Sequence, residues 1–307
     1  MIHFKNVTKI FKSELLTQPF VALDKVEFSV PEGSMVGFLG ANGAGTTTSL
    51  TIIMDFIRPT SGGVEFGKAL GQSKLEIFRN LGFLPERPYF YPNLTGEDFL
   101  LFMGDLSEMP RPQIRREIER WAPRFKITHA LNRELKTYSK GMLQRIGFMA
   151  TILHHPKLII LDEPLSGLDP IGRKELKDVI VEVHRDGKTV FFSSHIVPDI
   201  EEICDRVIFL KEGKLVYDGP VNNLLVNNKD TDYIAILQQK DGAGFTTPVK
   251  QAIRLPESLT KYVVSSEHKD SFLREALEKK TNIFSLEMVK PSLEEIFYKT
   301  KGAGSDS

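Results

Sequence analysis

The pattern of apolar positions changes along the chain and predicts where strands and helices lie. Three short runs, at 35–39, 158–161 and 190–192, are almost continuously apolar, as expected of strands buried on both faces of a parallel sheet. Between the last two, apolar residues recur at helical spacing over 172–184, which predicts a helix with one exposed face. Strand and helix patterns alternate up to about residue 220, and this alternation predicts an α/β layer fold.

Residues from about 87 to 155 are richer in helical patterns than the segments around them. Thr95 is a candidate N-cap for a helix over 97–103, and residues 113–121 form a highly charged helical segment. A third predicted helix carries four apolar residues on one face, namely Met142, Ile146, Met149 and Leu153. This block is therefore predicted to be a helical insertion within an α/β domain that spans residues 1–220.

The pair Gly219-Pro220 marks the end of the α/β pattern. Strand, helix and strand patterns follow at 233–237, 271–279 and 283–289. Residues 221–300 are therefore predicted to form a small α+β accessory domain. Residues 292–295 have the sequence of a capping box, which predicts a last short helix, and residues 301–307 are predicted to be a flexible tail.

Composition and charge narrow the class of protein. The 307 residues include 40 Lys plus Arg and 40 Asp plus Glu, and this balance argues against nucleic-acid binding through an overall basic field. The single cysteine, Cys204, excludes an intramolecular disulfide and is predicted to be a small core residue in a helix with Ile203. The sequence has no apolar run of about 20 residues and no signal-peptide core at its start. We therefore expect a cytoplasmic protein that reaches a membrane only through a partner.

A glycine-rich segment lies between the predicted strand at 35–39 and an apolar helical stretch. This is the context of a phosphate-binding loop with the pattern G-x-x-x-x-G-K-[ST], in which backbone N–H groups and a helix N-terminus surround phosphate oxygens. Thr47 stands where a hydroxyl ligates Mg²⁺. The candidate nucleotide-binding residues are Gly40, Asn42, Gly43, Ala44, Gly45, Thr46, Thr47 and Thr48.

The loop departs from this pattern at one position, because Thr46 occupies the place of the lysine. Threonine is uncharged and too short to reach the β- and γ-phosphates. A charge-assisted hydrogen bond contributes about 1.5–3 kcal/mol, and one lost electrostatic donor slows a chemical step by about 10²–10³-fold. The sequence therefore predicts weakened nucleotide binding and very slow hydrolysis. Thr46 is either a substitution that traps one state or the natural residue of a degenerate ATPase.

Two adjacent carboxylates, Asp162 and Glu163, end the apolar strand at 158–161. Sheets of this class bind ligands at the carboxyl ends of their strands, and two carboxylates there need a metal or a partner. Asp162 is predicted to hold Mg²⁺ directly or through water. Glu163 is predicted to act as the general base toward an attacking water molecule.

Three further segments have a defined order around these carboxylates. They are Tyr138-Ser139-Lys140-Gly141-Met142-Leu143-Gln144-Arg145, Leu165-Ser166-Gly167-Leu168-Asp169-Pro170 and Phe192-Ser193-Ser194-His195. Together with the phosphate loop, they make residues 1–220 resemble the ATP-binding subunit of an ABC transporter. The resemblance implies a P-loop NTPase cassette with a RecA-like core, an antiparallel β subdomain and a helical insertion, and it implies ATP and Mg²⁺ as ligands.

The resemblance also implies roles for residues outside the phosphate loop. Ser139, Lys140 and Gly141 match the signature motif, which contacts the γ-phosphate held by the opposite subunit of a head-to-tail dimer; Lys140 replaces a glycine of that motif. Asp169 matches the D-loop aspartate that couples the two sites. His195 matches the switch histidine, which contacts the γ-phosphate and the general base.

Two further positions are candidates for the nucleotide site. Glu86 stands at the position of the family's Q-loop glutamine, where a carboxylate oxygen can ligate Mg²⁺ but adds negative charge near the phosphates. Phe11 stands where family members stack an aromatic ring on adenine. Phe20 is a competing candidate, and a core position is an alternative for either ring.

Two regions indicate partners of the chain. The segment Arg87-Pro88-Tyr89-Phe90-Tyr91-Pro92 matches the region that receives the coupling helices of the membrane subunit, and exposed aromatics beside a basic residue suit such an interface. The segment Lys290-Pro291-Ser292-Leu293-Glu294-Glu295-Ile296-Phe297 resembles the ending of ATPase subunits of ABC-2 type exporters. The resemblance implies a separate membrane permease as partner and a peripheral location on the inner face of the cell membrane.

These observations leave two candidate functions and disfavour a third. The first is an ATPase subunit that dimerises around two ATP–Mg²⁺ and powers a permease. The second, favoured by Thr46, is a degenerate subunit that binds ATP and dimerises in a structural or regulatory role without useful hydrolysis. A soluble ABC ATPase acting on nucleic acid or ribosomes typically has two cassettes or long coiled-coil insertions, and the sequence shows one cassette and no heptad segment.

Overall fold

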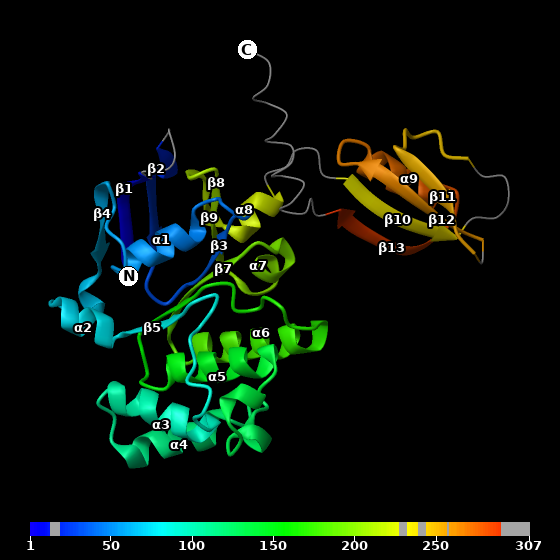
Figure 1. Ribbon diagram of the computed structural model, residues 1–307. Helices are drawn as coiled ribbons and strands as arrows, with labels where there is room; N and C mark the ends of the chain where they lie inside the picture. The colour runs from blue at the N-terminus through cyan, green and yellow to red at the C-terminus, as the bar shows by residue number, and fades with distance from the viewer. Residues whose placement is uncertain (13–18, 227–231, 239–243, 257, 290–307) are drawn as a thin grey trace. The chain divides into compact units, whose positions relative to one another are not determined.

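The computed structural model describes residues 1–12, 19–226, 232–238, 244–256 and 258–289 of the chain. The chain divides into two compact units, Met1–Pro220 (unit 1) and Val221–Ser307 (unit 2) (Figure 1). The predicted short helix at 292–295 and the predicted tail at 301–307 lie outside the described residues.

A sheet with the strand order β5-β6-β7-β3-β8-β9 forms the centre of unit 1. Its strands are β3 (Met35–Leu39), β5 (Leu81–Leu84), β6 (Leu158–Leu161), β7 (Thr189–Ser194), β8 (Arg206–Lys211) and β9 (Lys214–Pro220). All neighbouring strands are parallel except β9, which pairs antiparallel with β8 at one edge. Every residue of β3, β6 and β7 is buried. This burial explains the continuous apolar runs and confirms the three predicted strands.

A second sheet, with the order β2-β1-β4, is antiparallel and confirms the predicted β subdomain. Its strands are β1 (Ile2–Phe11), β2 (Phe20–Val30) and β4 (Ser61–Phe66). The ring of Phe28 stacks on Phe4 with centroids 4.7 Å apart and also meets Phe38 of β3 at 5.4 Å. The two sheets therefore contribute to one apolar core, together with helix α1 (Thr46–Ile53).

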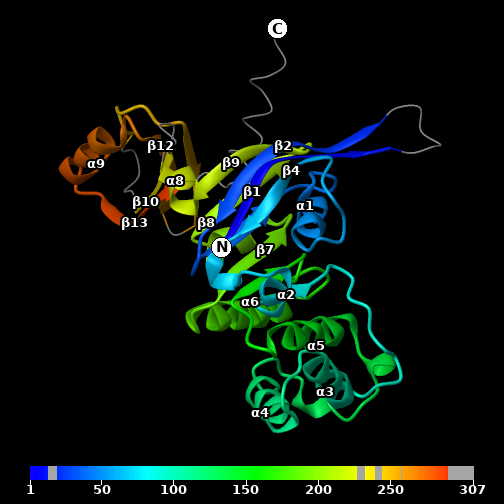
Figure 2. The same cartoon turned by 90° about the vertical axis from the view of Figure 1, so that its left-hand side faces the viewer.

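The predicted helical insertion lies between β5 and β6. It contains α3 (Gly96–Leu106), α4 (Arg111–Trp121), η2 (Thr128–Ala130), η3 (Leu135–Thr137) and α5 (Lys140–Ile152). Thr95 caps α3 by accepting a hydrogen bond from the Asp98 N–H at 3.1 Å. Figures 1 and 2 agree that α3 and α4 lie at the end of unit 1 opposite the antiparallel sheet. Two shorter elements, η1 (Lys68–Leu70) and α2 (Lys74–Arg79), precede β5.

Two helices follow the strand ends that carry candidate site residues. Helix α6 (Pro170–Arg185) contains the predicted helix at 172–184, and α7 (Val197–Ile203) follows β7. Helix α7 packs closely on β3, because a Cβ at Gly37 would lie 2.5 Å from Cγ2 of Ile200. Cys204 is buried as predicted but caps the end of α7 rather than lying within the helix, and burial raises the pKa of its thiol.

The described part of unit 2 is an antiparallel sheet on which one of its two helices, α9 (Lys269–Glu278), packs. The strand order is β11-β12-β10-β13, with β10 (Asp232–Gln238), β11 (Gln251–Arg254), β12 (Leu259–Ser265) and β13 (Asn282–Val289); the other helix is α8 (Val221–Val226). Phe272 of α9 packs with Tyr262 and Phe245 in a small core. The predicted α+β character is confirmed, although β11 and β12 were not predicted. Across the described parts of both units, no helix combines the length and apolarity needed to span a bilayer.

Candidate functional site

The phosphate-loop candidate connects β3 to α1 at the carboxyl edge of the central sheet. Gly43 and Gly45 adopt φ angles of 82° and 103°, in the left-handed region that favours glycine. At Gly45 a Cβ would also lie 2.8 Å from the carbonyl oxygen of Ala22. The glycine spacing of this loop is therefore required by its backbone path.

The backbone of the loop leaves several hydrogen-bond donors free. Ala44 donates to the Ala41 carbonyl at 2.9 Å, and Gly213 donates to the Ala44 carbonyl at 3.0 Å, so two bonds brace the turn. In the described part of the chain, no hydrogen-bond acceptor is found for the N–H groups of Gly43, Gly45, Thr46, Thr47 and Thr48. Free donors at the N-terminus of a helix suit an anion, and here they suit the phosphates of a nucleotide.

Thr46 is half-buried at the start of α1. Its methyl group lies against Gly40, where an added Cβ would be 2.8 Å from Thr46 Cγ2. The side chain therefore places an apolar group beside the start of the loop and supplies no positive charge there.

Asp162 follows β6 and is only 3% exposed. Burial raises the pKa of its carboxyl group. A hydrogen bond from Ser193 lowers this pKa, the negative charges of Glu163 and Glu86 raise it, and a hydrogen bond from Thr47 lowers it. The charged neighbours that act on Asp162 are thus both negative, and its ionised form would be stabilised by a bound cation.

Ser193 joins the two adjacent carboxylate residues, a role that was not predicted from the sequence. Its Oγ donates to Asp162 Oδ1 at 2.7 Å and accepts from the backbone N–H of Glu163 at 2.8 Å. The strand register places it there, since Leu161 of β6 pairs with Phe192 of β7. The sequence feature that could have indicated this role is a serine near the end of the apolar strand that follows the one ending in Asp162 and Glu163.

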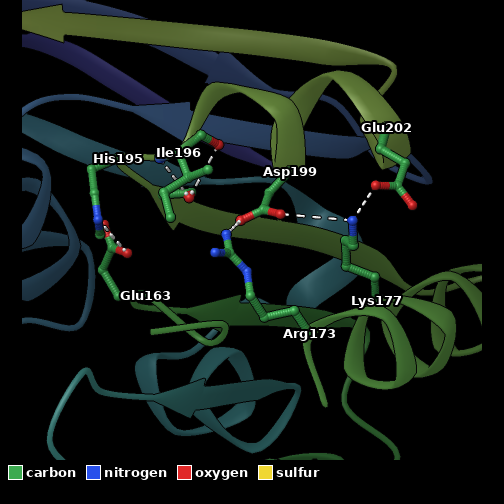
Figure 3. Close-up of polar contacts among 8 residues, drawn as sticks. Glu163, Arg173, Lys177, His195, Ile196, Asp199 and Glu202 are labelled. Atoms are coloured by element: carbon green, nitrogen blue, oxygen red, sulfur yellow. Dashed lines mark hydrogen bonds and ion pairs between the residues drawn. The ribbon is translucent and has the colours of Figure 1, made fainter. Parts of the chain in front are cut away.

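Glu163 and His195 meet across the ends of β6 and β7. His195 Nδ1 lies 2.9 Å from Glu163 Oε2, and Figure 3 shows the two side chains facing one another. Glu163 has a φ of 49°, a strained conformation for a residue other than glycine. Asp162, Ser193, Glu163 and His195 therefore form one hydrogen-bonded series, which we call the carboxylate edge.

The signature residues lie beside the segment that leads to Asp169. Ser139 caps α5 by accepting from the Met142 N–H at 3.3 Å. The Lys140 side chain lies over Gly167, and Gly141 faces Leu168. Asp169 caps α6 by accepting from the Gly172 N–H at 3.1 Å. The structure thus brings these residues together at the start of two helices.

Phe11 and Phe20 are cross-strand partners at the end of β1 and β2. They are 41% and 56% exposed, so neither is a core aromatic. The Lys9 ammonium lies 4.9 Å from the centroid of the Phe11 ring. Both rings remain available to stack on a base.

The candidate Mg²⁺ ligands Thr47, Glu86 and Asp162 are close enough for the first two to shift the pKa of the third. Among the residues that the structure describes, no group of three His, Cys, Asp or Glu side chains could hold a metal alone. Two carboxylates and a hydroxyl fit Mg²⁺, which takes its remaining oxygen ligands from water and phosphate.

Comparisons with known proteins point to one family. The family described as ABC transporter matches residues 23–166. An uncharacterized ABC transporter ATP-binding protein of Nostoc sp., all4389, is 33% identical over 95% of this chain and 87% of its own length. The bacitracin transport ATP-binding protein BcrA of Bacillus licheniformis is 36% identical over 75% of this chain and 72% of its own length. A solved structure titled as the ATP binding subunit of an ABC transporter superposes with a TM-score of 0.63, at 26% identity, over 73% of this chain and 91% of that one.

Proposed function

The chain belongs to the family of ABC transporter ATP-binding proteins, and we propose that it is the ATP-binding subunit that powers a separate membrane permease. The carboxylate edge carries this proposal. It joins a candidate cation ligand, Asp162, to a candidate general base, Glu163, through hydrogen bonds of 2.7 and 2.8 Å. Because β7 is the neighbour of both β6 and β3, this edge lies next to the strand that leads into the phosphate loop.

Each part of the site has a distinct role in the proposed ATPase. The free N–H groups at the start of α1 would bind the phosphates, and Thr47, Glu86 and Asp162 would hold Mg²⁺. The cation, when bound, neutralises charge on the phosphates. Glu163 accepts a proton from the attacking water, and His195 orients its carboxylate through the 2.9 Å contact.

We further propose that hydrolysis by this chain is slow because Thr46 supplies no cation to the phosphates. The residues around the loop support this view, because Asp162 is buried near the acids Glu163 and Glu86, and Thr46 adds no positive charge beside the phosphates. A second candidate function follows from the same residue. The chain would then bind ATP and dimerise as a structural or regulatory subunit without useful hydrolysis.

A second copy of the chain is the proposed partner at the nucleotide site. Ser139, Lys140 and Asp169 lie together at the N-terminal ends of α5 and α6, with Lys140 exposed. In a head-to-tail dimer these groups would face the phosphates bound by the opposite subunit and complete each site.

An apolar groove in the helical insertion is the proposed docking site for the permease. It encloses about 480 Å³ between β5, α3 and α5, and its lining includes Tyr89, Phe90, Tyr91 and Phe102. Tyr89 is 82% exposed, which suits an interface anchor more than a packing residue. A permease of ABC-2 exporter type is proposed, and docking to it would place the chain on the inner face of the cell membrane.

Alanine substitutions at Tyr89 and Tyr91 test this docking site. We expect the double variant to lose co-purification with the membrane subunit while its affinity for ATP stays unchanged. The Leu277→Ala variant is a matched control, since Leu277 is 66% exposed in unit 2. Full co-purification of the tyrosine variant would contradict the assignment.

Equilibrium ATP titration and sedimentation test the nucleotide function. We expect the chain to bind ATP in a Mg²⁺-dependent manner, and Thr46→Lys to tighten binding by about 10- to 150-fold. With ATP–Mg²⁺, the Thr46→Lys variant should sediment as a dimer. A chain that binds no ATP, with or without the substitution, would refute the proposal. A variant that binds ATP and dimerises but hydrolyses none would favour the second candidate function.

A further inference from the structure

Four charged side chains join α6 to α7, the helix that follows His195 in the chain. Arg173 and Lys177 of α6 meet Asp199 and Glu202 of α7, and Figure 3 shows the two helices linked through them. Arg173 pairs with Asp199 Oδ2, the Lys177 ammonium lies 3.7 Å from Asp199 Oδ1, and Lys177 also pairs with Glu202. We call this set the α6–α7 ion cluster.

Asp199 is the buried centre of the cluster. It is 4% exposed, whereas the side chain of Glu202 is 54% exposed. A buried carboxylate is retained only where cations and hydrogen bonds offset its lost hydration. Arg173 and Lys177 provide that compensation, so the position of α7 depends on two side chains of α6.

Each end of the cluster is linked through the backbone to a segment that carries a candidate site residue. Asp199 lies four residues after His195, and its N–H donates to the Ile196 carbonyl at 3.2 Å. Arg173 lies four residues after Asp169 and donates its N–H to the Asp169 carbonyl at 2.9 Å. One ion pair therefore connects the helix that follows the histidine to the helix that follows the D-loop aspartate.

His195 itself has few restraints from packing. Its side chain is 45% exposed, and its contact with Glu163 is a single hydrogen bond of 2.9 Å. On the sheet side, α7 is held by Ile200 against Gly37 of β3. Sliding of α7 along this apolar contact would move His195 unless α7 is also held from the side of α6.

We propose that Asp199 is a positioning residue, whose pairing with Arg173 holds His195 against Glu163. This inference rests on the proposed ATPase function only for its consequence in turnover. The contact between His195 and Glu163 is a property of the chain without nucleotide and can be measured separately. Asp199 acts through His195 and touches neither the substrate nor the reacting atoms.

Imidazole NMR of the full chain tests the positioning directly. The chain has seven histidines, and the resonance of His195 is assigned by its loss in His195→Ala. We expect Asp199→Asn to shift this resonance to the position that Glu163→Ala gives. The control Glu202→Gln removes one carboxylate from the exposed end of the same cluster and should leave the resonance unchanged. A resonance that does not move in Asp199→Asn would overturn the proposal, whatever the ATPase activity of the chain.

The second readout is the rate of ATP turnover, measured in chains that also carry the Thr46→Lys substitution. Displacement of a catalytic group by about 1 Å can cost about 100-fold in rate, so we expect Asp199→Asn to lower kcat by about 10- to 100-fold with little change in KM. Because Asp199 acts through His195, Asp199→Asn should slow a His195→Ala variant no further. Independent, multiplying effects would indicate a structural role and overturn the proposal.

If Asp199→Asn does not fold, Arg173→Lys replaces it, since lysine keeps the charge but loses the planar fork of the guanidinium. The same shift of the His195 resonance and the same lack of additivity with His195→Ala are expected. An unshifted resonance in Arg173→Lys would equally contradict the proposal. An absence of turnover in every variant, together with the expected NMR shifts, would refute the ATPase function and leave the positioning role intact.

Discussion

The pKa values of two carboxylates, Asp162 in unit 1 and Glu275 in unit 2, are shifted in opposite directions by their surroundings. Burial and negative neighbours raise the pKa of Asp162. Partial burial acts to raise the pKa of Glu275 too, but hydrogen bonds from Lys279, Thr247 and Thr246 lower it far below its usual range. The comparison shows that the fold supplies a cation and hydrogen-bond donors to Glu275. Asp162 has no such cation nearby among the described side chains, so a bound ligand is expected to provide it.

The contacts of the two groups explain the contrast. Glu275 accepts from the backbone of Thr246 and Thr247 at 2.7 and 2.8 Å, and from the Lys279 ammonium at 2.8 Å. Asp162 accepts from the Ser193 hydroxyl at 2.7 Å, and its charged neighbours are acids. Glu275 therefore ties a loop to α9, whereas Asp162 needs a cation that the described side chains do not supply.

Of the substitutions that test this contrast, removal of the Asp162 charge should change ATP turnover the most. In the presence of Thr46→Lys, we expect Asp162→Asn to lower ATP turnover by about 10²–10³-fold, because the site loses the charge that holds Mg²⁺. The thermal midpoint should stay the same or rise, since asparagine still accepts from Ser193 and removes a destabilising buried charge. Steady-state assays and calorimetry measure the two effects. Retained turnover with a lower midpoint would make Asp162 a structural residue like Glu275.

Loss of the Ser193 hydroxyl should have a smaller effect on the same edge. Ser193→Ala leaves the N–H of Glu163 without its acceptor and Asp162 with one donor fewer, at a cost of about 1–3 kcal/mol. We expect a loss of about 5- to 150-fold in turnover, with nucleotide affinity nearly unchanged. Ser193→Thr keeps the hydroxyl and serves as the control. Equal activity of Ser193→Ala and the parent chain would remove Ser193 from the account.

The smallest expected effect is the pH dependence of the stability that Glu275 contributes. The pKa of Glu275 is lowered by folding, so its stabilising contribution is present above the unfolded value of about 4.3 and is lost as the pH falls toward the lower folded value. We expect Glu275→Gln to destabilise unit 2 by about 1 kcal/mol at pH 7, a value that allows for solvent screening, and by less at pH 3. Denaturant unfolding of the full chain at both pH values measures this. A pH-independent difference would contradict the assignment.

Some parts of the fold and site could be predicted from the sequence because their signals are local. The strands at 35–39 and 158–161 are buried throughout, so their apolar runs are unbroken. The glycines of the phosphate loop indicate positions where the backbone has a positive φ angle, such as the φ of 103° at Gly45. In contrast, β11 is exposed along its whole length, so no apolar periodicity marked it.

Other parts of the site depend on contacts between distant segments and could not be predicted. Ser193 reaches Asp162 because of the register between β6 and β7, which one sequence does not reveal. Asp199 pairs with Arg173 across 26 positions, and charged residues at helical spacing are usually solvated. From the sequence alone, Ser193 is only a serine near the end of a strand, and Asp199 is only an acidic residue in a helix.

The rate of ATP hydrolysis by the chain and by its Thr46→Lys variant is the most direct test of the central claim. The claim is that the carboxylate edge is complete and that the phosphate loop lacks one cation. Single-turnover measurements with Mg²⁺ should show a rate about 10²–10³-fold higher for Thr46→Lys. Equal rates in the two proteins would contradict the account.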